Sequence, residues 1–150
     1  MDDGDLEVTF DHIPTDLGWG LASWLLDAGA DEFTFRCVAA RSSNLAVCRA
    51  ADLALSAYRV RTREDSFQTA TVPGTDRRWR LTRDSLEVLR GLLPDGILTD
   101  RQGSDDGWIE DLTVYRGDVP CLEVNTHEHR ATLRLTDAEY GQLREARLID

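Results

Sequence analysis

The sequence contains no lysine, only one methionine and only three cysteines among its 150 residues. All 17 side chains counted as lysine or arginine are therefore arginines, which indicates a GC-rich coding sequence of the kind common in bacteria. Ion pairs with the carboxylates must then use a guanidinium group, whose planar fork favours bidentate pairing.

The three cysteines are Cys37, Cys48 and Cys121, an odd number at wide spacing with no Cys-x-x-Cys pair. This pattern argues against a zinc site and against a disulfide framework. We therefore expect reduced and mostly buried thiols, and we expect no cofactor.

Long apolar runs are also absent, and none approaches the roughly 20 residues that cross a bilayer. The opening residues MDDGDLEV lack the basic and apolar regions of a secretory signal. A content of 41% hydrophobic and 30% charged residues is ordinary for one globular domain, here residues 1–150. We expect a cytoplasmic protein with no membrane partner.

The motifs of the commonest enzyme classes are missing. The sequence has no Gly-x-Ser-x-Gly elbow, no phosphate-binding glycine loop, no dinucleotide fingerprint and no His-Glu-x-x-His. We therefore assign no catalytic residue.

Hydrophobic periodicity predicts a single α+β domain with a mostly antiparallel sheet and about four helices packed on it. Alternation with period two predicts strands in seven segments. These are Leu6–Phe10, Glu32–Val38, Phe67–Val72, Arg78–Leu81, Trp108–Arg116, Leu122–Thr126 and Ala131–Leu135. Helical spacing and capping residues predict helices that begin near Thr15, Leu45, Thr82 and Thr136.

Matching of apolar faces predicts the register of the last three strands, since a slip of one residue turns a strand over. In the first hairpin, a loop over residues 117–119 sets Val114 opposite Leu122. In the second, a loop over residues 127–130 sets Val124 opposite Leu133. After the third strand, Thr136 and Glu139 stand at the positions of a capping box.

The net charge of −11 is unevenly distributed. Residues 1–35 hold nine acids and no arginine, and residues 95–111 hold six acids and one arginine, whereas residues 36–94 hold eleven arginines and six acids. A field this negative repels nucleic acid. We expect the arginines at positions 77, 78, 80 and 83 to pair with the N-terminal acids.

The acidic segments also contain tryptophans, and this combination favours a basic protein partner, because charge speeds encounter and a buried aromatic side chain slows release. The function we expect is that of an inhibitor or immunity-type protein that neutralises a basic partner such as a toxin. The candidate partner-binding residues are Asp11, Asp16, Trp19, Asp105, Asp106, Trp108 and Glu110.

Two other functions stay open from the sequence. His127 and His129 are two potential ligands of a small metal-dependent hydrolase, with a third ligand to come from Asp111, Glu123 or His12. Alternatively, the chain is a structural subunit that self-associates through a sheet edge or its first helix. The sequence leaves the oligomeric state undecided.

Overall fold

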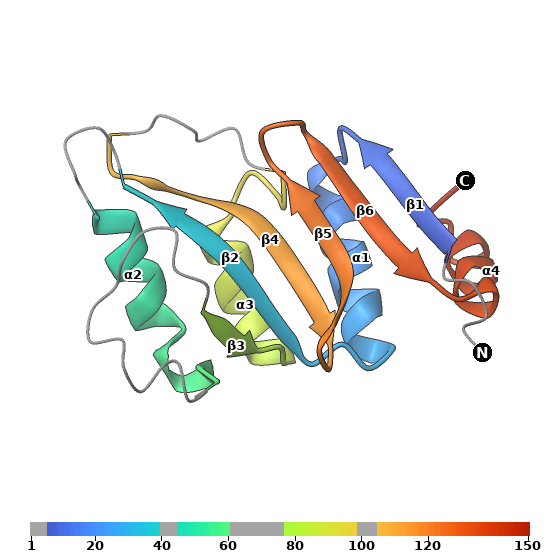
Figure 1. Cartoon of the computed structure of the whole chain (residues 1–150), viewed down its shortest axis with the longest axis horizontal. Coiled ribbons are helices and arrows are strands. Elements are labelled where there is room, and N and C mark those ends of the chain that lie inside the picture. Colours follow the sequence, from blue (N-terminus) through green and yellow to red (C-terminus); the bar gives the residue numbers. More distant parts are fainter. Residues whose placement is uncertain (1–5, 40–44, 61–76, 99–104) are drawn as a thin grey trace.

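The computed structural model describes residues 6–39, 45–60, 77–98 and 105–150. These residues form an α+β fold with four α-helices and a six-stranded sheet, which confirms the predicted fold class (Figure 1). The predicted strand Phe67–Val72 lies outside the described residues. In chain order the elements are β1 (Leu6–Asp11), α1 (Thr15–Asp27), β2 (Glu32–Val38), α2 (Ala46–Ala54), a 3-10 turn (Ser56–Tyr58), β3 (Arg78–Arg80), α3 (Arg83–Leu92), β4 (Trp108–Arg116), β5 (Val119–Asn125), β6 (Arg130–Leu135) and α4 (Asp137–Glu145).

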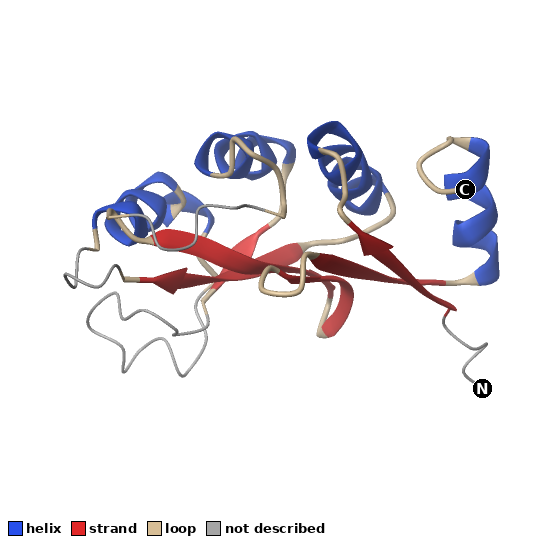
Figure 2. Cartoon of the chain, turned by 90° about the horizontal axis from the view of Figure 1, so that it is seen from above, coloured by secondary structure: helices blue, strands red, loops and turns tan. Residues whose placement is uncertain are grey.

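The strands follow the order β1-β6-β5-β4-β2-β3, and every neighbouring pair is antiparallel. All four helices lie on one face of this sheet, as Figure 2 shows. Among the described residues, no helix has the length and apolar character that a membrane crossing requires.

The core lies between the helices and the sheet. Phe33, Leu112, Leu122 and Leu133 from four different strands are at most 1% exposed. The residues that alternate with them carry polar groups to the helix-free face, because successive side chains of a strand point to opposite sides.

The β4–β5 hairpin has the predicted apolar pairing but a different loop. Val114 lies opposite Leu122 as predicted, yet the expected three-residue loop is wrong, because a two-residue turn at Gly117 and Asp118 connects the strands. Gly117 has φ 61°, which suits glycine in a tight turn. A β-bulge at Cys121 supplies the extra residue that restores the apolar pairing.

The β5–β6 hairpin is shifted by two residues from the prediction. Leu122 lies opposite Leu133, and Val124 lies opposite Ala131. A shift of two leaves every side chain on its predicted face. The loop therefore covers residues 126–129, one position earlier than expected.

Two of the four described helices, α3 and α4, begin with the side-chain cap that the sequence predicts. Thr82 and Thr136 both accept a hydrogen bond from the backbone N–H three residues on, within complete capping boxes. Thr15 is instead the first residue of α1 after Pro14, and its hydroxyl donates to the Asp95 carbonyl at 3.1 Å. The helix that was predicted to begin near Leu45 is short, because α2 ends at Ala54 and a 3-10 turn follows.

One capping carboxylate makes the stability of the fold depend on pH. Burial by itself raises the pKa of Glu139, but hydrogen bonds from Arg116 and from the Thr136 backbone outweigh it and lower the pKa below 4.5. The Arg116 Nη2 to Glu139 Oε2 distance is 2.8 Å. A carboxyl whose pKa is lowered on folding stabilises the protein above its unfolded-state pKa, and the effect disappears as pH falls through the folded-state value.

We therefore expect the free energy of unfolding to fall more steeply between about pH 5 and pH 3 in the wild type than in Glu139→Gln. Glutamine retains the capping geometry but does not titrate. Urea denaturation at a series of pH values measures this, with Glu145→Gln on the same helix as control. Parallel pH profiles for wild type and Glu139→Gln contradict the assignment.

Candidate functional site

One end of the sheet gathers most of the residues that the sequence singled out. At this end, the upper one in Figure 1, β1 and β2 finish, β4 begins and the β5–β6 loop turns. We call it the acidic end. It comprises residues 11–16, 36–38, 46–50, 95–98, 105–111 and 126–130.

Hydrogen bonds between distant segments join the acidic end into one surface. Each connects two elements that are far apart in the sequence. They are His12 N–H to the His129 carbonyl at 3.2 Å, Thr15 Oγ1 to the Asp95 carbonyl at 3.1 Å, and Val47 N–H to the Asp106 carbonyl at 3.1 Å.

Among the described residues of the acidic end, carboxylates outnumber guanidinium groups. The only arginines within its residues are Arg36, Arg49 and Arg130. Arg130 pairs with Asp11, with 3.1 Å between Nε and Oδ1. The carboxylates are Asp11, Asp16, Asp95, Asp105, Asp106, Glu110, Asp111 and Glu128, and all except Glu110 and Asp111 are exposed.

Charges near the opposite end of the sheet are paired. Arg78 contacts Glu32 at 3.0 Å, and Arg83 pairs with Asp27. These contacts agree with the expected pairing to N-terminal acids for Arg78 and Arg83, but the expectation is wrong for Arg77. The guanidinium of Arg77 lies 2.6 Å from a carboxylate of α2, Asp52.

The N-terminal acidic segment is consequently divided between the two ends of the sheet. Asp11 and Asp16 lie at the acidic end, whereas Asp27 and Glu32 lie at the other. Trp19, a candidate partner-binding residue, is only 6% exposed and belongs to the core. Its position on α1 turns the indole inward, so it cannot meet a partner in this structure.

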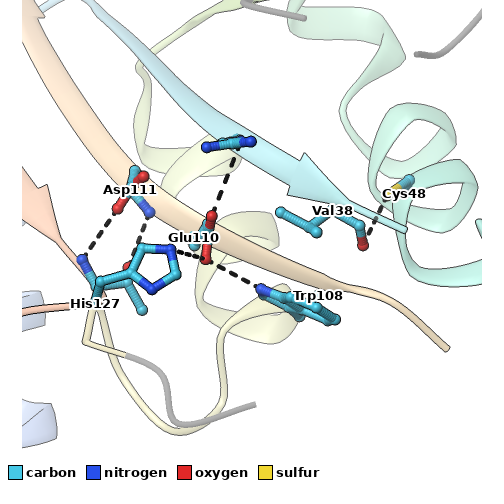
Figure 3. Close-up of polar contacts among 8 residues, drawn as sticks. Val38, Cys48, Trp108, Glu110, Asp111 and His127 are labelled. Carbon is cyan, nitrogen blue, oxygen red and sulfur yellow. Dashed lines mark hydrogen bonds and ion pairs between the residues drawn. The ribbon is translucent and has the colours of Figure 1, made fainter. Parts of the chain in front are cut away.

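Glu110 is the most buried of the candidate acids. It is 3% exposed, and its carboxylate accepts a hydrogen bond from Trp108 Nε1 at 3.1 Å (Figure 3). The same carboxylate lies 3.5 Å from His127 Nε2 and 3.9 Å from Arg36 Nε. A buried carboxylate needs such partners, because removal from water is costly for a charge. Glu110 therefore organises neighbouring side chains rather than facing solvent.

A local break in β4 places these groups. Asp111 has φ 56°, a left-handed conformation that aspartate tolerates better than most residues. Its backbone N–H donates to Thr126 Oγ1 at 2.9 Å, and Thr126 N–H donates to Asp111 Oδ1 at 3.0 Å. This reciprocal pair fixes the start of the β5–β6 loop and brings His127 to Glu110.

A pocket of about 230 Å³ opens beside the exposed Asp105 and Asp106. It lies where α2, the end of α3 and the start of β4 meet. Its lining residues are mostly apolar. They are Val47, Ala50, Gly91, Leu92, Leu93, Pro94, Asp106, Gly107, Trp108 and Ile109.

The structure separates the two histidines of the metal hypothesis. His127 lies at Glu110, whereas the His129 ring stacks on His12 with 5.9 Å between centroids. The described residues contain no group of three or more histidine, cysteine, aspartate or glutamate side chains arranged to hold a metal ion. No observation in the described part of the chain favours the hydrolase hypothesis.

The expectation of three reduced cysteines is wrong. Cys37 on β2 and Cys48 on α2 form a disulfide, and only Cys121 is a free thiol. The packing of α2 on β2 brings the two sulfurs together although eleven positions separate them. Figure 3 marks a contact between the Cys48 sulfur and the Val38 carbonyl oxygen, which are 3.9 Å apart. Burial raises the pKa of Cys121 to about 11, so this thiol is protonated and unreactive at neutral pH.

Removal of the Glu110 carboxylate leaves the Trp108 N–H and the Arg36 guanidinium without this acceptor. We expect Glu110→Ala to lower the free energy of unfolding by about 2–4 kcal/mol. Urea denaturation measures the loss. The control is Glu123→Ala, because that side chain is 46% exposed and should change stability by less than about 1 kcal/mol. Equal losses in the two variants would contradict a central role for Glu110.

Thiol titration checks the disulfide. Under denaturing conditions without reductant we expect one reactive thiol per chain, from Cys121, and three after reduction. Closure of a loop of this length contributes roughly 3 kcal/mol to stability, so reduction should also lower the unfolding midpoint. Three reactive thiols in freshly purified, unreduced protein would show that the bond does not form.

Comparison with known proteins gives no family for this chain. No family model, no curated protein and no solved structure matches it. The function therefore has to be inferred from the acidic end itself.

Proposed function

We propose that the protein is an acidic binding domain whose acidic end receives a basic protein partner. One observation carries the proposal. Among the residues that the structure describes, eight carboxylates, six of them exposed, and three guanidinium groups lie at this end, while Arg78 and Arg83 near the opposite end are paired with the protein's own acids.

The exposed carboxylates provide the attraction. Asp105 and Asp106 are adjacent and exposed, Asp106 lines the pocket, and Asp16 is exposed in the first turn of α1. A surface of one sign accelerates encounter with an oppositely charged partner and makes the rate depend on salt. Trp108 supplies a half-buried aromatic side chain that its hydrogen bond to Glu110 holds in place.

The partner we propose is a protein rather than a nucleic acid, because the surplus carboxylates repel phosphates. The form we favour is an inhibitor or immunity-type protein of bacterial origin that blocks a basic partner such as a toxin. We also propose a cytoplasmic location. A persistent Cys37–Cys48 bond argues against this location, because reducing conditions keep most cytoplasmic thiols unpaired. Thiol trapping in intact cells therefore tests it, and an oxidised Cys37–Cys48 pair in the trapped protein would contradict a cytoplasmic location.

Binding of a defined cationic probe tests the proposal. The probe is a fluorescent peptide of alternating arginine and glycine, titrated by anisotropy at low and at physiological salt. We expect Asp105→Asn with Asp106→Asn to weaken binding by about three- to tenfold, since each exposed charge pair contributes up to roughly 1 kcal/mol. Salt should weaken binding to the wild type.

The control variant has the same net charge but changes the other end of the sheet. It combines Asp118→Asn, in the β4–β5 turn, with Glu145→Gln at the end of α4. Its affinity should stay within about twofold of the wild type, because screening confines surface charges to roughly 8 Å at physiological salt. Equal weakening in the two double variants would mean that net charge alone attracts the probe, and would overturn the proposal.

A further inference from the structure

The pocket beside Asp105 and Asp106 indicates the kind of side chain that the basic partner carries, which charge alone does not. We propose that it receives one apolar side chain of the basic partner, so that the segment recognised carries an apolar residue among arginines or lysines. This inference rests on the proposed function, because it identifies the occupant of the same surface.

The size of the pocket fits a side chain. Its volume is about 230 Å³, and a protein cavity of about 150 Å³ already holds a benzene molecule. A leucine, methionine or phenylalanine side chain therefore fits, whereas a folded domain does not. Apolar walls from Val47, Leu92 and Ile109 favour such an occupant over a charged one.

The carboxylates beside the pocket favour a basic segment. Asp106 lines the pocket and Asp105 is its exposed neighbour. The lining residues, all within the described part of the chain, include no arginine. An apolar side chain in the pocket thus places its neighbours in the peptide beside carboxylates, where cationic groups are favoured.

The walls of the pocket are held in place before any partner binds. The Cys37–Cys48 disulfide attaches α2 to β2, and Val47 N–H donates to the Asp106 carbonyl at 3.1 Å. The opposite wall is the end of α3, where Leu89 and Leu93 are buried in the core. Prior ordering reduces the entropic cost of binding.

Two helical glycines allow a matched test. Gly91 lines the pocket and Gly141 lies on α4, and a Cβ added at either position meets no heavy atom within 4 Å. We expect the side chain of Gly91→Leu to occupy the pocket, whereas Gly141→Leu adds the same side chain elsewhere. Both substitutions should favour their helices, since glycine is a poor helix former.

The probes are two labelled peptides, one of alternating arginine and glycine and one in which a central glycine is replaced by leucine. We expect wild type and Gly141→Leu to bind the leucine peptide about five- to tenfold more tightly than the plain peptide. Gly91→Leu should bind both peptides with the affinity that the wild type has for the plain one.

A second pair of variants tests the pocket with substitutions on α2, which forms its other wall. Ala50→Phe on α2 should also remove the preference for leucine, whereas Ala54→Phe, one turn away and outside the pocket lining, should keep it. This pair decides the question if Gly91→Leu does not fold.

The outcomes separate this inference from the proposed function. If the plain peptide binds and the Asp105 and Asp106 substitutions weaken it, but leucine adds nothing, the pocket is not the anchor site and only this inference fails. If neither peptide binds at low salt, the proposed function fails as well. Retention of the leucine preference in both pocket-filling variants also overturns the assignment of the pocket.

Discussion

Two hydrogen bonds between Asp111 and Thr126 determine the shape of the acidic end. They run in both directions, at 2.9 and 3.0 Å, and Thr126 is fully buried. They fix where β5 stops, and so they set the position of His127 beside Glu110. They also fix the start of β6, where Arg130 forms an ion pair with Asp11. This reciprocal pair of hydrogen bonds thus helps to place charged groups of β4, β6 and the β5–β6 loop at the same end of the sheet.

Local rules in the sequence predicted most of the secondary structure. Period-two alternation located five of the six strands to within two residues at each end, because one face of an antiparallel sheet is buried. Capping chemistry located the starts of α3 and α4, since Thr82 and Thr136 each satisfy a backbone N–H that would otherwise lack a partner. These features depend on residues only a few positions apart.

Contacts between distant residues were the ones that the sequence did not reveal. Hairpin register depends on bulges and on hydrogen bonds in the loops. The predicted β4–β5 loop was one residue too long, and the apolar pairing was still correct because the bulge at Cys121 adds one residue. Trp19 is buried because of the way in which α1 is rotated against the sheet. The Cys37–Cys48 disulfide likewise depends on the packing of α2 on β2. One local signal was available. Ile109 and Leu112 are both buried yet three positions apart, and this break in the alternation marks the place where Glu110 and Asp111 leave the regular strand pattern.

The uneven distribution of charge supports the proposed recognition of a partner, because solubility alone does not require it. A net charge keeps a protein soluble even when the charged side chains are spread over the whole surface. Solubility therefore does not explain why carboxylates gather at one end of the sheet. Concentrated carboxylates repel one another and destabilise the free protein, a cost that salt reduces and that a cationic partner removes. The same chain pairs Arg78 and Arg83 with nearby acids at the other end, so arginine is not in short supply. Exposed carboxylates gathered beside an apolar pocket, within the described part of the chain, therefore support the proposed cationic partner.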